Sequence, residues 1–241
     1  SAFLATDISG AEFGRSLAKY LTRKGYQVRV DLLPEWYDKP EEIDVVIVLR
    51  GLSVYKINSR HINIMWNISH PDKVSKPEYE TYDAVFVASD VWAGKLKKEL
   101  SVRVEPLLQC TDPEVFYPDY SDDCRTSILF VGNSRKIFRP IVRDVIDSGF
   151  DVSIYGTLWE GLVDDRYIKG NYIPNPSLRK YYSSCSVLLN DHWEDMKNKG
   201  FISNRIFDAL ACRSFVISDL VSGAESVFGE SLVTYAASGD L

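Results

Sequence analysis

One stretch decides the fold: Gly200-Phe201-Ile202-Ser203-Asn204-Arg205-Ile206-Phe207-Asp208-Ala209-Leu210-Ala211-Cys212, followed closely by Phe215-Val216-Ile217-Ser218-Asp219. It predicts a glycine loop, a helix, a small-residue turn and an apolar strand. A helix start of this kind presents free backbone N–H groups and a positive dipole end, which suit a phosphate. Asp208 lies one turn beyond Asn204, so it can share a helix face with a ligand held at the helix start. Its carboxylate can accept hydrogen bonds from ribose hydroxyls. We therefore expect a nucleoside diphosphate site, with an ordinary strand–helix loop capped by Ser203 or Asn204 as the alternative.

The rest of the chain alternates short apolar runs with amphipathic stretches. The expected strands are 2–5, 28–33, 45–49, 62–68, 84–88, 104–108, 128–132, 151–155, 167–169, 186–190, 214–218 and 232–235. The expected helices are 12–24, 91–100, 138–148, 176–184, 203–212 and 223–228. Strands separated by helices predict right-handed βαβ units and mostly parallel sheets.

A linker divides this pattern into two halves. Asp112–Pro118 holds two prolines, and a polar stretch, 119–126, follows it. We expect two α/β domains, an N-terminal domain over 1–119 and a C-terminal domain over 120–241. Ligands of such sheets bind outside the carboxyl ends of the strands, and the cleft between two domains is the default site.

Composition narrows the possible classes of protein. Of the 241 residues, 45% are hydrophobic and 26% are charged, which is typical of a globular chain. The net charge of −6 argues against a nucleic-acid partner, because such binding usually needs a basic face. No apolar run approaches the roughly 20 residues of a transmembrane helix. The four cysteines match no zinc pattern; we expect Cys185 and Cys212 to be buried free thiols, and a reducing cytoplasmic location.

A second candidate site follows the strand that begins the C-terminal half, in Ile128–Arg139. Gly132 allows a sharp turn or a close approach to a ligand. Arg135, Lys136 and Arg139 can meet a pyrophosphate, because arginine binds such groups bidentately. A solvated basic helix start is the alternative. Motifs of P-loop ATPases, serine hydrolases, zinc proteases and EF-hands are absent from the sequence, which counts against those classes.

Histidines and aromatic residues at other strand ends supply weaker candidates. His70 directly follows an apolar strand, where its imidazole can bind a sugar hydroxyl or act as a base, although a lone histidine is more often structural. His192 is the second candidate of this kind. Tyr155-Gly156 and Tyr172-Ile173 follow other strands and can contact a nucleotide base, with aromatic packing as an equal alternative.

The C-terminal half resembles the donor domain of GT-B glycosyltransferases, including the family 1-type bacterial group related to spore maturation protein CgeB. The resemblance is carried by Phe130–Asn133, Ile154–Gly156, Tyr181-Tyr182, Val187–Asn190 and, above all, Gly200–Cys212. The N-terminal half, with Trp66–Pro71 and Pro106–Pro113, is similar to the acceptor domains of that group. The resemblance implies two Rossmann-like domains facing across a cleft, without the closing C-terminal helices typical of the fold.

The resemblance also implies a role for each candidate residue. Asp208 binds the ribose, and His70 faces the donor sugar and acts in catalysis. Tyr155, Gly156, Tyr172 and Ile173 contact the base. The donor diphosphate is met by Gly132, Asn133, Arg135, Lys136, Arg139 and Arg205. The donor sugar is contacted by one loop, partly through its backbone amides; this loop consists of Lys199, Gly200, Phe201, Ile202, Ser203 and Asn204.

One departure from the family concerns the residue before Gly200. Many retaining members have a glutamate there, whereas this chain has Lys199, which cannot accept hydrogen bonds from sugar hydroxyls but can contact a phosphate. Arg205 can also be a surface residue or pair with Asp208.

These observations predict a metal-independent glycosyltransferase. It would move a hexosyl group from a nucleotide-diphosphate sugar to an acceptor hydroxyl. The resemblance to the family further implies a carbohydrate or glycoprotein acceptor in bacterial surface glycan biosynthesis. No cofactor, nucleic-acid partner or transmembrane segment is expected. A non-catalytic nucleotide- or protein-binding module and a sugar-nucleotide epimerase remain alternatives.

Overall fold

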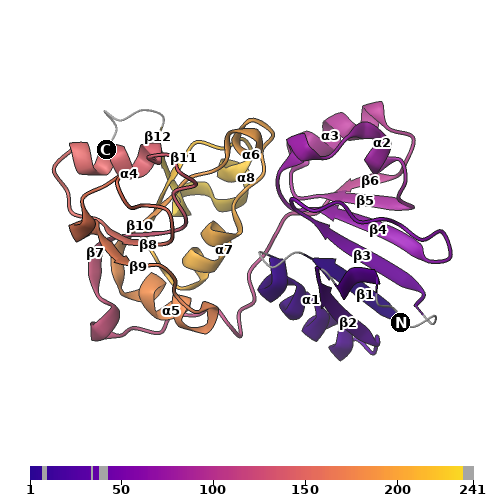
Figure 1. Cartoon of the computed structure of the whole chain (residues 1–241), viewed down its shortest axis with the longest axis horizontal. Coiled ribbons are helices and arrows are strands. Elements are labelled where there is room, and N and C mark those ends of the chain that lie inside the picture. Colours follow the sequence, from indigo (N-terminus) through magenta and orange to yellow (C-terminus); the bar gives the residue numbers. More distant parts are fainter. Residues whose placement is uncertain (7–9, 34, 38–42, 236–241) are drawn as a thin grey trace. The chain divides into compact units, whose positions relative to one another are not determined.

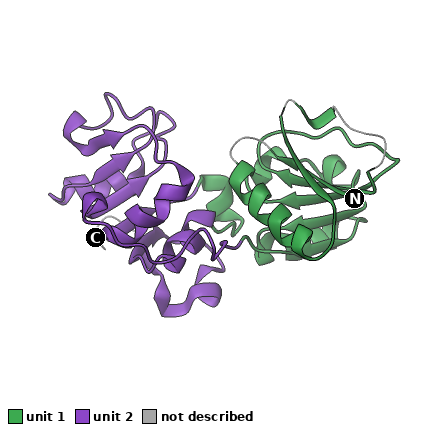
Figure 2. Cartoon of the chain, turned by 90° about the horizontal axis from the view of Figure 1, so that it is seen from below, with its two compact units in different colours: residues 1–109, 193–202 green, residues 110–192, 203–241 purple. Residues whose placement is uncertain are grey.

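The computed structural model describes residues 1–6, 10–33, 35–37 and 43–235 (Figure 1). Over these residues the chain forms two compact units. The first contains residues 1–109 and 193–202, and the second contains residues 110–192 and 203–241 (Figure 2). The segment 193–202 therefore leaves the second unit, joins the first, and returns.

The first unit is built on a parallel sheet in which six strands are described, in the order β2-β1-β3-β4-β5-β6. The strands are β1 (Ala2–Thr6), β2 (Val28–Leu32), β3 (Val45–Arg50), β4 (Ile62–Asn67), β5 (Ala84–Val87) and β6 (Val104–Pro106). Their central residues are apolar on both faces, as in the consecutive residues Val48 and Leu49, because helices and loops cover a parallel sheet on both sides.

The helices of the first unit are α1 (Ala11–Arg23), α2 (Lys76–Tyr79), α3 (Asp90–Glu99) and α6 (Glu194–Asn198). Helix α1 packs against β1 and β2, and α3 packs against β5 and β6 (Figure 1). Met196 of α6 and Phe201 just after it belong to the hydrophobic core of this unit. These two apolar side chains explain why the segment 193–202 stays with the first unit.

The second unit repeats the design with a parallel sheet in the order β12-β11-β10-β7-β8-β9 over its described residues. The strands are β7 (Thr126–Val131), β8 (Ser153–Tyr155), β9 (Ile168–Gly170), β10 (Cys185–Asn190), β11 (Val216–Asp219) and β12 (Val233–Tyr235). Counted from β7, this is the Rossmann order, in which the direction of strand addition reverses between the first and fourth strands. The reversal lies between β7 and β10.

The helices of the second unit are α4 (Pro140–Asp147), α5 (Asn175–Ser184), α7 (Asn204–Ala211) and α8 (Ala224–Phe228). Helices α4 and α5 pack against β10, and α7 packs against β10 and β11. Phe130, Ile154 and Leu189 lie in the core between sheet and helices.

The structure confirms the predicted fold class of two parallel, Rossmann-like α/β sheets. It adds two short helices that the sequence analysis did not include, α2 and α6. Cys185 and Cys212 are buried free thiols, as expected. The proposed division into domains at residue 120 stays a prediction. The first compact unit runs to Gln109 and also includes the segment 193–202. The sequence was expected to end without the closing C-terminal helices of the fold; its last residues, 236–241, lie outside the described residues.

Candidate functional site

The candidate site of the second unit lies where β7 and β10 end side by side. Gly132 follows β7, Asp191 follows β10, and the two strands pair in parallel, so their carboxyl ends meet at one edge of the sheet. This edge is the point where the strand order reverses, and open α/β sheets bind ligands there. Helix α7, which begins at Asn204, packs against β10 at the same place.

Two glycines fix the backbone at this edge. A Cβ on Gly156 would lie 2.2 Å from the carbonyl oxygen of Gly132, so only glycine fits between the turns after β7 and β8. The amide of Gly132 donates to the carbonyl oxygen of Tyr155 at 2.8 Å, and the indole N–H of Trp159 donates to the carbonyl oxygen of Gly132 at 2.8 Å. The side-chain oxygen of Asn133 accepts from the amide of Thr157 at 2.8 Å. The turn that carries Gly132 and Asn133 is therefore held on several sides.

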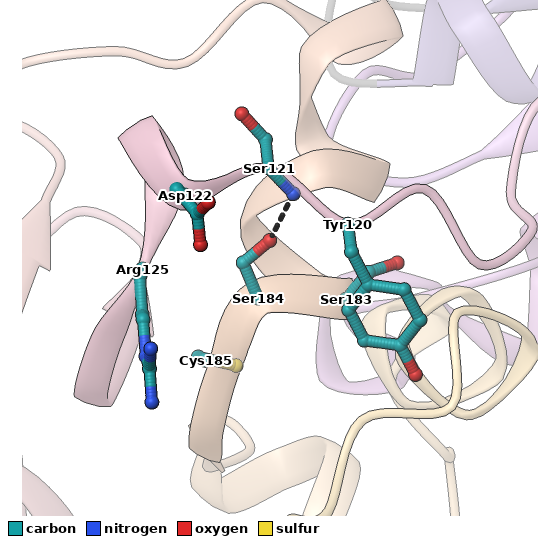
Figure 3. A pocket seen from close by; sticks show the side chains of 7 residues that line it. All are labelled: Tyr120, Ser121, Asp122, Arg125, Ser183, Ser184 and Cys185. Carbon is teal, nitrogen blue, oxygen red and sulfur yellow. Dashed lines mark hydrogen bonds between the residues drawn. The ribbon is translucent and has the colours of Figure 1, made fainter.

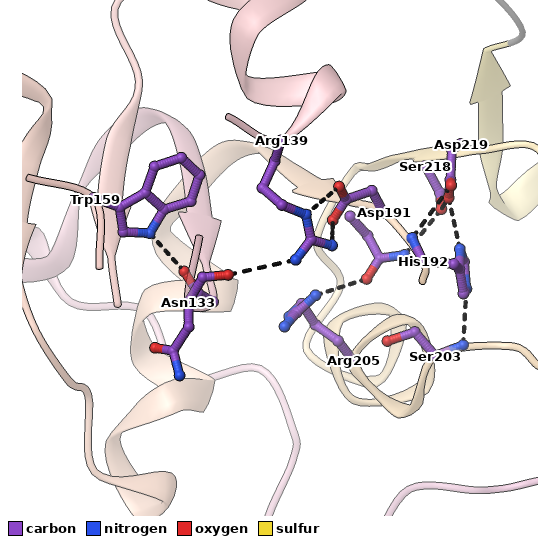
Figure 4. Close-up of polar contacts among 11 residues, drawn as sticks. Asn133, Arg139, Trp159, Asp191, His192, Ser203, Arg205, Ser218 and Asp219 are labelled. Carbon is purple, nitrogen blue, oxygen red and sulfur yellow. Dashed lines mark hydrogen bonds and ion pairs between the residues drawn. The ribbon is translucent and has the colours of Figure 1, made fainter. Parts of the chain in front are cut away.

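Arg139, predicted to meet a diphosphate, is buried and paired with a carboxylate (Figure 4). It precedes α4 as the N-cap residue. Its guanidinium donates through Nε to Oδ2 of Asp191 at 2.7 Å and through Nη2 to Oδ1, and both side chains are more than nine-tenths buried. This bidentate pair joins the residue before α4 to the end of β10, so much of the charge of Arg139 is already balanced within the protein.

Arg205, in the first turn of α7, lies nearer to solvent. Its Nη1 donates to the side-chain oxygen of Asn190, the last residue of β10, at 2.9 Å. A Cβ on Gly132 would lie 3.2 Å from Nη2 of Arg205, so the missing side chain of Gly132 makes room for this guanidinium. Because the partner amide is neutral, Arg205 brings a half-buried positive charge to the edge of the sheet.

Arg135 and Lys136 lie in the turn between β7 and α4. Both have φ of 63°, a left-handed conformation that is uncommon for residues other than glycine. Ser134 holds this turn: its hydroxyl donates to the carbonyl oxygen of Leu158 and accepts from the amide of Lys136 at 3.0 Å. Arg135 is half-buried and Lys136 is exposed. Strained residues of this kind gather at binding sites, which fits the predicted role of this turn.

His192 links the end of β10 to the start of α7. Its Nδ1 lies 2.6 Å from Oδ1 of Asp219, and its Nε2 accepts from the amide of Ser203 at 2.9 Å (Figure 4). These partners require the tautomer with the proton on Nδ1, because Nε2 acts as the acceptor. The imidazole is buried. Asp219 fixes its orientation through Nδ1, and Nε2 holds the amide of Ser203, the N-cap of α7. The amide of Ser203, predicted as a ligand contact, is thus used inside the protein.

Asp208, predicted to bind ribose, is a buried carboxylate on α7. Its Oδ1 accepts from the hydroxyl of Thr111 at 2.8 Å, and its Oδ2 accepts from the side-chain amide of Asn204 at 2.9 Å. Burial raises the pKa of Asp208 to about 7, against the opposing effect of these two hydrogen bonds and of Arg205. The side-chain oxygen of Asn204 is itself buried without a hydrogen-bond partner, so the pair offers an unused acceptor to a ligand hydroxyl.

The residues predicted to contact a base lie at the other strand ends of the same sheet. Tyr155, the last residue of β8, packs edge-on against Tyr181 with ring centres 5.1 Å apart. Tyr172 follows β9 and is 74% exposed, whereas Ile173 is buried. Gly156 donates from its amide to the carbonyl oxygen of Gly170 at 2.9 Å. Of this set, Tyr172 offers the most open aromatic face.

His70, predicted as the catalytic residue, belongs to the first unit. It follows β4 in a left-handed conformation, with φ of 50°. Its ring packs against Trp193 at 5.4 Å, and its Nδ1 lies 3.8 Å from Oδ2 of Asp195 in α6. Asp195 was not among the predicted residues, and its place beside His70 depends on the docking of the segment 193–202.

The loop Lys199–Ile202 also belongs to the first unit, so it is divided from Ser203 and Asn204. Lys199 forms an ion pair with Asp72, its ammonium lies 4.6 Å from the ring centre of Trp92, and burial lowers its pKa. Its carbonyl oxygen accepts from the hydroxyl of Ser89 at 2.5 Å. Gly200 has φ of 70°, and the side chains of Phe201 and Ile202 are buried. The amide of Phe201 donates to the carbonyl oxygen of Met196.

A separate hollow of about 300 Å³ lies at the opposite edge of the sheet, near the first residues of β7 and β10 (Figure 3). It is lined by Tyr120, Ser121, Asp122, Arg125, Ser183, Ser184 and Cys185. The hydroxyl of Ser184 accepts from the amide of Ser121 at 2.9 Å, which ties the start of the second unit to α5. Because it adjoins the amino ends of the strands, it is not part of the candidate site.

Several residues of the candidate site were missed by the sequence analysis. Asn190, Asp191 and Asp219 stand at strand ends, and that position was the signal that could have found them. Thr111 gave no such signal, because it lies 97 residues from Asp208 in the sequence.

Comparison with known proteins finds a family match in the C-terminal half of the chain. Residues 125–241 match the family model described as Glycosyl transferase-like. The chain carries a glycosyltransferase-like domain. No curated protein sequence matches the chain. The recognised resemblance to glycosyltransferases is thus confirmed for this domain, while the relationship to the CgeB group stays a prediction.

Among solved structures, 29 chains match, and one shows the fold of the whole chain. It is described as an alpha-glucosyltransferase in complex with UDP-glucose and DNA containing an abasic site. The match has a TM-score of 0.59 and 10% sequence identity, and it covers 96% of this chain and 80% of the other. The glycosyltransferase-like domain is therefore part of a two-sheet GT-B fold.

No described helix is both long and apolar enough to cross a membrane. In the described part of the chain, no group of three or more His, Cys, Asp or Glu side chains is placed to hold a metal ion.

Proposed function

We propose that the glycosyltransferase-like domain binds a nucleotide-diphosphate sugar and transfers the sugar to an acceptor hydroxyl. The observation that carries this proposal is the arrangement of α7. Its first turn brings Arg205 to the edge of the sheet, and oxygen acceptors are offered by Asn204, the first residue of the helix, and by Asp208 one turn later. Cationic donors at the helix start and acceptors one turn away match a diphosphate joined to a ribose.

The diphosphate is the leaving group of the proposed reaction. As the bond between sugar and phosphate breaks, negative charge accumulates on the phosphate oxygens. The amides of Asn204 and Arg205, the first two residues of α7, precede the hydrogen bonds within the helix, and Arg205 adds a full positive charge beside them. Arg135, Lys136 and Asn133 are the proposed contacts on the β7 side, while Arg139 holds the turn through Asp191. We propose that these groups stabilise the leaving group without a metal ion.

The nucleoside is proposed to lie along α7 and the neighbouring strand ends. Asp208 accepts hydrogen bonds from the ribose, and the buried oxygen of Asn204 accepts a further one. Tyr155, Gly156, Tyr172 and Ile173 are the proposed contacts of the base, with the open face of Tyr172 available for stacking.

In the first unit, His70 is the proposed base that removes the proton from the acceptor hydroxyl. We propose Lys199 and the loop Gly200–Ile202 as donor-side contacts. A hexose as the sugar and a carbohydrate or glycoprotein as the acceptor, in bacterial surface glycan biosynthesis, complete the proposal.

Calorimetric titration tests the donor site. The chain is titrated with UDP, GDP, dTDP, CDP and ADP, with EDTA in one series and MgCl₂ in the other. UDP is taken first because the solved structure with the same fold contains UDP-glucose. The proposal expects one diphosphate to bind in both series and more weakly to Asp208→Asn. Binding to none of them by the folded chain would contradict it.

Transfer itself needs a second experiment. The matching nucleotide sugar is incubated with the chain, and the released nucleotide is measured with and without candidate glycan acceptors. The proposal expects release that depends on His70, so His70→Ala abolishes it while the diphosphate still binds.

A non-catalytic nucleotide-binding module is the second candidate. It is favoured by Lys199, which stands where many family members carry a glutamate and is engaged by Asp72. Tight diphosphate binding without nucleotide release would favour this function. Conversion of the donor to another sugar nucleotide without acceptor would instead indicate an epimerase.

A further inference from the structure

Thr111 lies at the start of the second unit and contacts a residue at the far end of the sequence. Its side-chain hydroxyl donates to Oδ1 of Asp208 at 2.8 Å. The residue is half-buried, and the carboxylate that it contacts is more than nine-tenths buried. This hydrogen bond joins the segment before β7 to the middle of α7.

The contact fixes the direction of the Asp208 carboxylate. Asn204 binds Oδ2 at 2.9 Å and Thr111 binds Oδ1, so each oxygen has one protein donor. A carboxylate oxygen has two lone pairs, and each oxygen therefore keeps capacity for one ligand hydroxyl. Two protein donors hold the group in one rotamer, in which its remaining capacity and the unpartnered oxygen of Asn204 belong to the same cluster.

We propose that Thr111 is a positioning residue that orients the Asp208 carboxylate for the ribose of the donor. This inference rests on the proposed function of the second unit. Thr111 does not itself need to touch the nucleotide. Its effect is exerted through Asp208, which a hydroxyl donor stabilises in the charged form more than in the neutral form.

The charges around Asp208 make this hydroxyl important. Burial in the second unit favours the neutral acid and raises its pKa to about 7. Arg205 on the same helix favours the charged form, whereas Asp112 disfavours it. The titratable groups that face Asp208 from the surrounding segments are Cys110, Asp112, Tyr182, Arg205 and Cys212. Only the two neutral donors, Thr111 and Asn204, bind its oxygens directly among the hydrogen bonds of the described residues.

Replacing Thr111 by valine removes the donor while keeping the side-chain shape. Losing one hydrogen bond to a charged group corresponds to a rise of about one unit in the pKa of Asp208. The carboxyl resonance of Asp208 is followed by carbon NMR in the ligand-free 241-residue chain, with Asp208→Asn to assign it. Thr111→Val is expected to shift the titration upward by about one unit, and Thr111→Ser is expected to restore it.

The matched control is Thr126→Val in the same unit. Thr126 is also half-buried and also forms one side-chain hydrogen bond, to Ser153 at 2.7 Å, but it lies on β7 away from Asp208. This variant should leave the titration of Asp208 unchanged. Thermal unfolding of all variants reports whether they are folded.

The nucleotide experiment uses the diphosphate that the wild-type chain binds among UDP, GDP, dTDP, CDP and ADP. Its affinity should rise with pH as Asp208 ionises, and Thr111→Val should move that rise to higher pH by about one unit. The terminal phosphate also titrates near pH 6, so the pH profile of Asp208→Asn is subtracted.

The outcomes separate the two proposals. An unchanged NMR titration in Thr111→Val, or a Thr111→Ser variant that behaves like valine, overturns the role of Thr111. A shifted NMR titration with an unshifted affinity profile also overturns it, because Asp208 then does not serve the ribose through this contact. A wild-type chain that binds no diphosphate contradicts the proposed function, whatever the NMR titration shows.

Discussion

The two units are built on the same plan but end their strands differently. In the first unit, Arg50 ends β3 and is completely buried; it forms an ion pair with Glu78 and donates to the carbonyl oxygens of Gly51 and Lys73. In the second unit, Arg139 is similarly sealed by Asp191, but Arg205 is half-buried beside it and donates to a neutral amide. An arginine at the end of a parallel sheet can thus be buried within its ion pair, as Arg50 and Arg139 are, or stay partly exposed, as Arg205 does.

A parallel sheet therefore supplies only the place for a site. What turns the edge of the second sheet into a candidate site is the combination of a partly available cation and a buried carboxylate on one helix. The following predictions test that contrast, beginning with the largest expected effect.

The buried ion pair between Arg139 and Asp191 in the second unit should be important for stability. Asp191→Ala leaves Arg139 buried and without its carboxylate, so we expect a loss of about 3–5 kcal/mol in the free energy of unfolding. Glu78→Ala in the first unit should cost less, because Arg50 keeps its two carbonyl partners. Urea denaturation of both variants measures this. Equal losses, or none for Asp191→Ala, would show that the two arginines are held alike.

The buried Asp208 should make stability depend on pH. Its pKa in the folded chain is raised to about 7 from 3.8, so the folded state holds a proton that the unfolded state releases. Stability is therefore highest below pH 4 for this group and is lost as pH rises toward 7 and above, by at most roughly 4 kcal/mol. Asp208→Asn should remove this dependence and be more stable than wild type at pH 8.

The control for this pH effect is Asp151→Asn, because Asp151 is 83% exposed. Thermal unfolding from pH 5 to pH 8 should give parallel curves for Asp151→Asn and wild type and a flatter curve for Asp208→Asn. A curve for Asp208→Asn that runs parallel to wild type would contradict the raised pKa.

Two glycines make a matched pair across the units. Gly156→Ala places a methyl group against the Gly132 carbonyl, so we expect a loss of about 1–3 kcal/mol in stability and weaker diphosphate binding. Gly94→Ala, inside α3, meets nothing within 4 Å and should stabilise the chain by up to about 1 kcal/mol. Denaturation and calorimetry of both variants decide this. A neutral Gly156→Ala would show that the turns have room to move.

The smallest expected effect concerns the shape of the cation at α7. Arg205→Lys keeps the charge but loses the planar fork that binds a phosphate through two N–H groups. We expect about tenfold weaker diphosphate binding, with unchanged stability. Arg143→Lys, at a half-exposed position on α4, is the control and should bind like wild type. An Arg205→Lys variant that also binds like wild type would remove Arg205 from the site.

Much of the fold could be predicted because strands such as Val45–Arg50 are apolar runs between turn residues, and α1 ends at a clear glycine signal. Helix α6 could not, because a single turn has no periodicity to read. Its place in the first unit depends on Met196 and Phe201 finding a core formed by residues far away in the sequence.

The candidate site was predictable in its parts but not in its pairings. The glycine turn after β7 and the carboxylate on α7 are visible in the sequence. The pairing of Arg139 with Asp191 spans 52 residues and that of Thr111 with Asp208 spans 97, and no local pattern specifies either. The same limit applies to Ser203, whose amide looked available until His192 was found to occupy it.

The most direct test of the nucleotide site is a nitrogen–proton NMR titration of the isotope-labelled 241-residue chain with the diphosphate that it binds. The account predicts that the amides of Gly132, Asn133, Asn204 and Arg205 shift together, and that those of Gly51 and Gly94 in the first unit do not. Shifts centred on Gly51 or elsewhere in the first unit, with the α7 amides unchanged, would contradict the account.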